Sequence, residues 1–219
     1  MTDKAVSALT SLTGANTATG DLVYIVDISE PSAADRSKKI TAEELQNYMK
    51  KFPATIGVGN ATPAASGAGI TFPATASASS DANTLDDYEE GTPASLAISG
   101  SATAGTGTYT TNVSRYVKIG RQVTVCGYLV WSAHTGTGNI LITGLPFASA
   151  NVTSLYQAGT IGYLDGMTLT ASNIPSIYLN YWNVTDISFA QMPVGGGASA
   201  PVPMDTAAAI IFAITYIAE

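Results

Sequence analysis

The chain of 219 residues has a formal net charge of −7, a pI of about 4.5 and only 11% charged residues. Outside residues 1–52 it carries three basic side chains, which are Arg115, Lys118 and Arg121. No basic cluster there can follow a phosphate backbone, so we expect no nucleic-acid partner. The single cysteine excludes a disulfide within the chain, and the single histidine excludes most histidine-based metal sites.

Residues 1–52 differ in composition from the rest of the chain, since they hold six of its nine Lys and Arg residues. The apolar, β-branched run Asp21–Ile28 predicts a strand. The motif Thr41-Ala-Glu-Glu44 matches a capping box, so we expect a helix that begins at Ala42 and is stopped by Pro53. Two short elements bury little surface alone, which predicts that this small α+β segment docks on another protein.

Residues 53–92 are predicted to form a thin stem or linker. Between residues 53 and 82 the chain has three prolines, mostly small side chains and no sustained periodicity. This composition suits a disordered linker. Small side chains also let neighbouring backbones approach closely, so a stem ordered by other copies of the chain is the alternative.

Residues 93–219 show the two-residue period of β-strands. Between residues 121 and 131 the large apolar side chains fall on one face: Val123, Val125, Leu129 and Trp131. Tyr109–Ile119 is expected to form a hairpin with this strand through a glycine turn. Further strands are expected at residues 139–143, 156–164, 174–181, 185–190 and 207–217. Seven or eight short antiparallel strands indicate a sandwich of the jelly-roll type.

The last of these strands, at residues 207–217, carries apolar side chains on both of its faces. Its five β-branched residues favour a strand over a helix. Because both faces would be buried, we expect this strand in the middle of the sheet or at a subunit contact.

The densest charge lies in the run Asn83–Thr92, which sets four carboxylates within five residues. They are Asp86, Asp87, Glu89 and Glu90. A carboxylate pair could cleave a glycosidic bond, and hard oxygen ligands could bind calcium. Adjacent acids on an extended segment alternate sides instead of facing one cleft, and the spacing of an EF-hand is absent, so we interpret the cluster as a structural junction.

Three stretches carry a resemblance to a known family. The run "SGAGITFPATASASSDANTLDDYEEGT" at 66–92 is followed by "TYTTNVSRYVKIGRQVTVCGYLVW" at 108–131 and "ITGLPF" at 142–147. Together they resemble the C-terminal module of bacteriophage tail-fibre and related virion proteins. The opening "SALTSLTGANTATGDLVYIVDISEPSAADRSKKITAEELQNYM" is similar to the N-terminal segment that often precedes such modules. In that family a tryptophan usually follows EEGT, whereas this chain continues Thr92-Pro-Ala-Ser-Leu.

The resemblance implies a homotrimer. Residues 1–52 would attach it to other virion proteins of the baseplate, tail or capsid, residues 53–92 would form an intertwined stem, and the β-domain would touch the host surface. At the junction Leu85 and Tyr88 would pack inward, while the four carboxylates stay in water or meet the three basic residues of the C-terminal part. Exposed pairs of that kind contribute about 0–1 kcal/mol each, so they would set register more than stability.

Receptor contact is expected where aromatic rings alternate with amide groups, because rings stack on sugars and amides bond their hydroxyls. The first candidates are Tyr178, Asn180, Tyr181, Trp182 and Asn183. Packing of one strand face into the core is the alternative explanation for part of this set. A second candidate patch comprises Trp131, His134 and Asn139, with His134 expected as an exposed loop residue.

These features favour a non-enzymatic structural protein of a phage virion, a short trimeric tail fibre that recognises a host glycan or outer-membrane protein by multivalent binding. A capsid decoration or head-fibre protein and a polysaccharide-cleaving tailspike enzyme are the alternatives. No cofactor or metal is expected, and Cys126 is expected to be a buried, small apolar residue. The first residues lack the apolar run of a secretory signal, so we expect synthesis in the host cytoplasm and a place on the tail or capsid surface of the virion.

Overall fold

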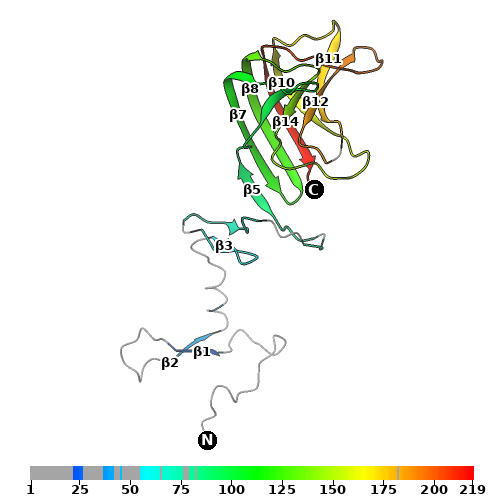
Figure 1. The fold of residues 1–219 in the computed structure, drawn as a ribbon. Coiled ribbons are helices and arrows are strands. Elements are labelled where there is room, and N and C mark those ends of the chain that lie inside the picture. Colours follow the sequence, from blue (N-terminus) through cyan, green and yellow to red (C-terminus); the bar gives the residue numbers. More distant parts are fainter. Residues whose placement is uncertain are drawn as a thin grey trace, which may run out of the picture. The chain divides into compact units, whose positions relative to one another are not determined.

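The computed structural model describes residues 55–64, 66–75, 79–81, 83–181 and 183–219, the backbone of residues 22–26 and 37–41, and Leu45. The chain forms two compact units, Met1–Pro73 and Ala74–Glu219, and Figure 1 labels strands of both units. Each unit is described by itself. The boundaries expected at residues 52/53 and 92/93 stay predictions.

In the first unit, β1 (Leu22–Val26) and β2 (Ser37–Thr41) pair antiparallel. The strand predicted at residues 21–28 is therefore confirmed as β1. The pattern does not predict β2, because its sequence Ser-Lys-Lys-Ile-Thr contains one apolar residue, Ile40. The helix expected from Ala42 lies outside the described residues except for Leu45, whose backbone is helical.

The proline-rich stretch has local structure of its own. Two short strands, β3 (Ile56–Gly57) and β4 (Ile70–Thr71), pair in parallel. The Thr71 hydroxyl lies 2.9 Å from Oγ1 of Thr55, and the Ala64 N–H donates to the same Thr55 oxygen over 2.6 Å. Residues 55–73 thus make hydrogen bonds within one chain, while winding of several copies about one another stays a prediction.

The second unit is built from one antiparallel sheet of ten strands. Its strands are β5 (Tyr88–Gly91), β6 (Ala97–Gly100), β7 (Gly107–Ile119), β8 (Gln122–His134), β9 (Ile140–Thr143), β10 (Gln157–Asp165), β11 (Asn173–Leu179), β12 (Ile187–Pro193), β13 (Ala200–Pro201) and β14 (Ala208–Ile217). Neighbours follow the order β5-β7-β8-β14-β10-β11-β12-β9-β6, and β13 pairs with β12. The mainly β, antiparallel architecture is confirmed, whereas the jelly-roll sandwich stays a prediction.

The hairpin and the central position of the last strand are also confirmed. β7 and β8 pair from end to end around Gly120, whose φ of 55° is readily adopted by glycine. β14 lies between β8 and β10. The four apolar residues predicted on one face of β8 are buried, and they join Ile210, Phe212 and Ile214 of β14 in one core. Each such side chain contributes about 1.5–3 kcal/mol through burial.

The sheet curls so that its last strand, β6, approaches β7. Side chains of β7 bond to the backbone of residues 96–98, at the opposite end of the strand order. The Tyr109 hydroxyl accepts a hydrogen bond from the Ile98 N–H at 2.7 Å, and the Asn112 amide donates to the Leu96 carbonyl at 3.1 Å. These bonds fix the curl on which the shared core depends.

The outer face of the β7-β8-β14-β10 part of the sheet carries one exposed apolar row. Four residues on adjacent strands are direct cross-strand neighbours and are 39–55% exposed: Val113, Tyr128, Ile211 and Tyr163. We call this row the apolar outer face. β8 and β14 contain no Asp, Glu, Lys or Arg, whereas β7 carries the exposed Arg115 and β10 the exposed Asp165.

Cys126 lies in the next row of the same face, opposite Arg115 and Ala213, and is exposed. The prediction that it is buried is wrong. The alternation of β8 that buries Val125 turns Cys126 away from the core. Among the residues that the structure describes, no helix has the length and apolar character needed to cross a membrane.

Candidate functional site

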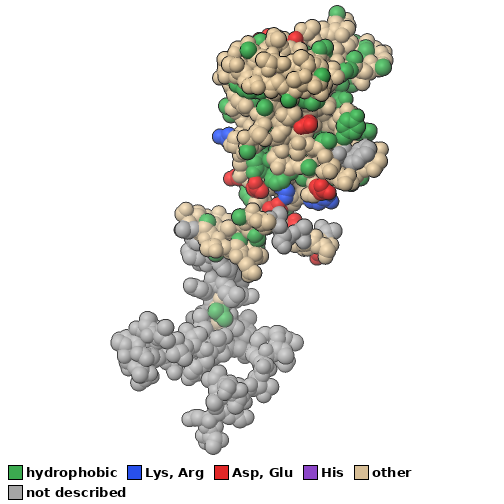
Figure 2. All heavy atoms as spheres, viewed as in Figure 1, with side chains coloured by type: hydrophobic (Ala, Val, Ile, Leu, Met, Phe, Trp, Pro, Cys, Tyr) green, Lys and Arg blue, Asp and Glu red, His purple; other side chains and the backbone are tan. Residues whose placement is uncertain are grey.

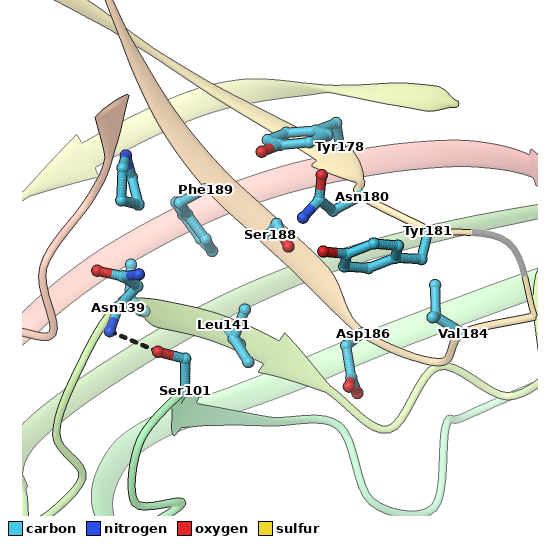
Figure 3. A pocket seen from close by; sticks show the side chains of 12 residues that line it. Ser101, Asn139, Leu141, Tyr178, Asn180, Tyr181, Val184, Asp186, Ser188 and Phe189 are labelled. Atoms are coloured by element: carbon cyan, nitrogen blue, oxygen red, sulfur yellow. Dashed lines mark hydrogen bonds between the residues drawn. The ribbon is translucent and has the colours of Figure 1, made fainter. Parts of the chain in front are cut away.

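A pocket of about 270 Å³ lies where β9, β11, β12 and β13 come together (Figure 3). Four of the receptor-contact candidates line it: Asn139, Tyr178, Asn180 and Tyr181. The other polar lining residues are Ser101, Asp186 and Ser188. The sequence pattern therefore names side chains that the fold brings together from segments about forty residues apart, and their role in receptor contact stays a prediction.

Strand alternation builds the floor of the pocket. Tyr178 of β11 is opposite Ser188 of β12, and Ser188 is opposite Leu141 of β9. The neighbouring Ile177 and Ile187 are fully buried in the core. Because successive side chains of a strand point to opposite faces, the residues next to these core positions face outward into the pocket.

Loops form the rim. Asn180 and Tyr181 follow the end of β11, and the Tyr181 ring is 60% exposed. In Figure 3 Tyr178, Asn180 and Tyr181 stand at one side of the pocket, and Ser101 and Asn139 at the other. The Asn139 N–H donates a 2.9 Å hydrogen bond to the Ser101 hydroxyl, drawn as a dashed line, which ties the two loops together.

Asp186 is the charged residue of the pocket. Burial raises the pKa of its carboxyl above the usual value of 3.8, and a hydrogen bond from the Thr185 side chain opposes part of that shift. The ionised form is disfavoured because water is partly excluded from it. Titratable groups with shifted pKa values gather at functional sites, so Asp186 is a candidate for contact with a ligand.

Replacing Asp186 by asparagine is expected to raise the thermal midpoint at pH 7. The gain arises because the variant avoids the cost of burying the ionised carboxylate. Since the folded-state pKa is raised, the gain is complete above that pKa and vanishes below the unfolded value, where the wild-type carboxyl is protonated in both states. Differential scanning calorimetry of both proteins between pH 3 and 7 measures it. Asp165→Asn, which removes an exposed carboxylate, is the control. If Asp186→Asn lowers the stability at pH 7, or raises it equally at every pH, the pKa of the Asp186 carboxyl is not raised by folding.

Asp186 and Ser188 line the pocket, although the sequence analysis does not single them out. The segment 185–190 is correctly predicted as part of a strand, β12. From the sequence alone, its polar residues resemble those of any strand face that is exposed to water. Their alternation with the apolar Ile187 and Phe189 is a signal of outward direction, but only the pairing with β9 and β11 shows that they face a hollow.

Trp131 and His134 do not form the second receptor patch that the sequence suggests. Trp131 is a core residue of β8, 1% exposed, and its indole N–H donates to the Asp205 carbonyl at 3.0 Å. His134 ends the same strand and is 6% exposed. Its Nδ1 accepts from the Gly136 N–H at 2.9 Å, so Nε2 carries the proton and donates to the Ile98 carbonyl at 3.0 Å. The prediction that His134 is an exposed loop residue is wrong, because β8 extends to His134 and both side chains are buried.

Asn183 does not line the pocket. It is exposed and adopts a positive φ of 55°, a conformation that asparagine tolerates in turns. Trp182 is outside the described residues. The described members of the first candidate set are thus three pocket residues, Tyr178, Asn180 and Tyr181, and the exposed Asn183.

The acidic cluster lies at the edge strand β5, which pairs with β7. Glu89 and Glu90 are in the strand, and Asp86 and Asp87 directly precede it. Asp87 is buried and makes an ion pair with the buried Lys118, whose Nζ also lies 5.2 Å from the centre of the Phe147 ring. Glu89 accepts a hydrogen bond from the Tyr116 hydroxyl, which raises the pKa of Tyr116 to about 12. One of the three expected cations therefore meets the cluster.

The remaining parts of the cluster turn outward. The Tyr88 hydroxyl donates to Glu90 at 3.0 Å, and Asp86 accepts from the Ser79 N–H at 2.7 Å. Leu85 is 57% exposed and Tyr88 43% exposed, so in the single chain they do not pack inward as predicted; Asp87 does so instead. Figure 2 shows charged side chains gathered at this end of the second unit.

The two other predicted cations bind backbone carbonyls. Arg121 Nε donates to the Ala218 carbonyl at 3.0 Å, and Arg115 Nη1 donates to the Ser114 carbonyl at 2.7 Å. In the part of the chain that the structure describes, no three His, Cys, Asp or Glu side chains are placed to hold a metal ion together.

Comparison with known proteins adds one structural likeness. No protein-family model matches the sequence, and no curated protein matches it. Among solved structures, the Dettilon tailspike protein is similar with a TM-score of 0.49 and 18% identity, covering 60% of this chain and 24% of that one. The chain spans about a quarter of that protein's length. A likeness of this size carries no conclusion about function.

Proposed function

We propose that the chain is a short tail fibre of a bacteriophage that binds the host surface through the pocket between β9, β11 and β12. The observation that carries the proposal is the gathering of Asn139, Tyr178, Asn180 and Tyr181 around one hollow. Two tyrosine rings provide flat apolar surfaces, and two amides provide donors and acceptors beside them. This combination fits a saccharide, which has apolar ring faces and a rim of hydroxyls.

The proposed assembly is a homotrimer whose subunits contact one another through the apolar outer face. Contiguous exposed apolar surface is characteristic of interfaces. The chain has a net charge of −7, so copies repel one another except where a surface is uncharged, and β8 and β14 supply such a surface. Arg115 flanks it on one side and Asp165 on the other. In a cyclic trimer unlike edges of neighbouring subunits meet, so these opposite charges suit that symmetry.

Binding by this fibre needs no chemical step. Glycoside hydrolysis uses two carboxyl groups about 5–10 Å apart across the sugar bond. Asp186 is the single carboxylate among the described residues that line the pocket. In the acidic cluster, Asp87 pairs with Lys118, Glu89 with Tyr116 and Glu90 with Tyr88, so these acids do not face one cleft. Residues 1–52 would then attach the fibre to the virion, and the distal domain would adopt the jelly-roll arrangement expected from its strands.

Binding of the fluorescently labelled full chain to bacterial cells tests the proposal. The strains should include the one from which the gene comes. Tyr181→Ala is expected to lower the affinity about fivefold for each engaged site, because one ring contact contributes about 1 kcal/mol. Tyr156→Ala is the matched control, since Tyr156 is equally exposed but does not line the pocket. A chain that binds no strain, or binding that both variants keep unchanged, would contradict the proposal.

A further inference from the structure

The pocket between β9, β11 and β12 has a size and a charge that restrict its ligand. Its volume of about 270 Å³ lies below the roughly 300–1,000 Å³ of sites that enclose drug-sized molecules. One monosaccharide ring is therefore the unit that it can surround. Longer glycans would continue out of the pocket along the surface.

The charge inside is negative. Asp186 lines the pocket, and no Lys, Arg or His lies among the described lining residues. A sugar that carries a carboxylate or phosphate would bring a second negative charge next to the half-buried Asp186 with no cation to offset it. Like charges placed together in a partly dry site repel one another more strongly than they do in water. The pocket therefore disfavours uronic acids, sialic acids and phosphorylated sugars.

The same carboxylate favours donors. An ionised carboxyl group accepts hydrogen bonds on both oxygens, and bonds to it are stronger than those between neutral groups. The direction of the Asp186 pKa shift agrees with this role, because a group that has lost water gains most from a ligand donor. Ser188, Asn180 and the tyrosine hydroxyls offer neutral partners around it.

We infer that the pocket binds a single uncharged or ammonium-bearing pyranose ring and rejects acidic sugars, with Asp186 accepting hydrogen bonds from the hydroxyl or ammonium groups. The inference rests on the proposed function, since it names the ligand class of the same site. Tyr178 and Tyr181 supply the stacking surfaces, and Asp186 supplies the selectivity. A surface loop of an outer-membrane protein is the alternative ligand. It would pack against the aromatic rings, and its binding would not depend on the rejection of acidic sugars.

Saturation-transfer NMR and calorimetric titration of the full chain with matched monosaccharides test the inference. The probes are methyl hexopyranosides, methyl glucosaminide and methyl glucuronide. We expect the neutral glycoside of one hexose, or the amino sugar, to bind at least tenfold more tightly than the glucuronide. Asp186→Asn should weaken binding of the preferred sugar about tenfold and bring the ratio to the glucuronide close to one, because the charged acceptor and the repulsion disappear together.

Two further variants and a cell-binding measurement separate the possible results. Tyr181→Ala should weaken all sugars alike, whereas Tyr156→Ala should change none. Equal or tighter binding of the glucuronide, or a ratio that Asp186→Asn leaves unchanged, would overturn the inference. So would Tyr181-dependent binding to cells by a chain that binds none of the monosaccharides, an outcome that indicates a protein ligand and leaves the tail-fibre proposal standing. Loss of cell binding altogether contradicts the tail-fibre proposal itself.

Discussion

Replacing Lys118 by methionine is expected to destabilise the β-domain by about 3–5 kcal/mol. Methionine keeps most of the apolar stem that packs near Phe147 but removes the ammonium group that pairs with Asp87. Both side chains are buried, so the variant leaves an unpaired carboxylate away from water. A domain whose total stability is about 5–15 kcal/mol would lose a large part of it. Urea denaturation at pH 7 measures the change.

The control for this prediction removes a positive charge three residues away. Arg121 is exposed and donates to the Ala218 carbonyl, so Arg121→Met should cost no more than about 1 kcal/mol. The double variant Asp87→Asn/Lys118→Met should be more stable than Lys118→Met, because it removes the unpaired charge. Equal stability of Lys118→Met and Arg121→Met would show that the ion pair does not hold β5 against β7.

Replacing Ile211 by lysine is expected to dissociate the proposed trimer and to lower cell binding by about 10²–10⁴-fold. Ile211 lies in the middle of the apolar outer face, next to Tyr128 and Tyr163. Three lysines brought into an apolar contact would have to be dehydrated without partners, which costs several kcal/mol. Each released subunit keeps its pocket but loses the gain in effective concentration that linked sites provide.

Val152→Lys is the matched control for this variant. It introduces the same charge at an exposed apolar residue outside the apolar outer face. Circular dichroism should show the same strand content for both variants, because Ile211 points away from the core. If Ile211→Lys keeps the mass and cell affinity of the wild type, this face is not the subunit contact.

The hairpin and the last strand were predictable because their large apolar or β-branched residues recur with the two-residue period or fill both faces of a strand. Val123 and Val125 of β8 and Ile210 and Phe212 of β14 each fall on the face that the period requires. The sequence does not predict β5 as a strand, because Tyr88 is its only strand former beside two glutamates and a glycine. It exists through pairing with β7, a contact between segments about thirty residues apart.

The part of the candidate site that lies at the end of β11 was predictable from the sequence. Aromatic rings and amide groups alternate near residue 180, so the local sequence alone predicts Tyr178, Asn180 and Tyr181 as contact residues. Asp186 and Ser101 join them through the pairing of β12 with β9 and the loop contact to Asn139, and no local pattern encodes either contact. For His134 the prediction from the sequence is wrong, because the side chain is buried. Its polar side chain suggested exposure, yet two backbone hydrogen bonds satisfy it inside the fold.

Sedimentation equilibrium of the full chain tests the central claim most directly, since multivalent recognition by a fibre requires that copies associate. The account predicts a single species with three times the chain mass of 22.4 kDa, unchanged across micromolar concentrations. A folded species of 22.4 kDa under the same conditions would contradict it.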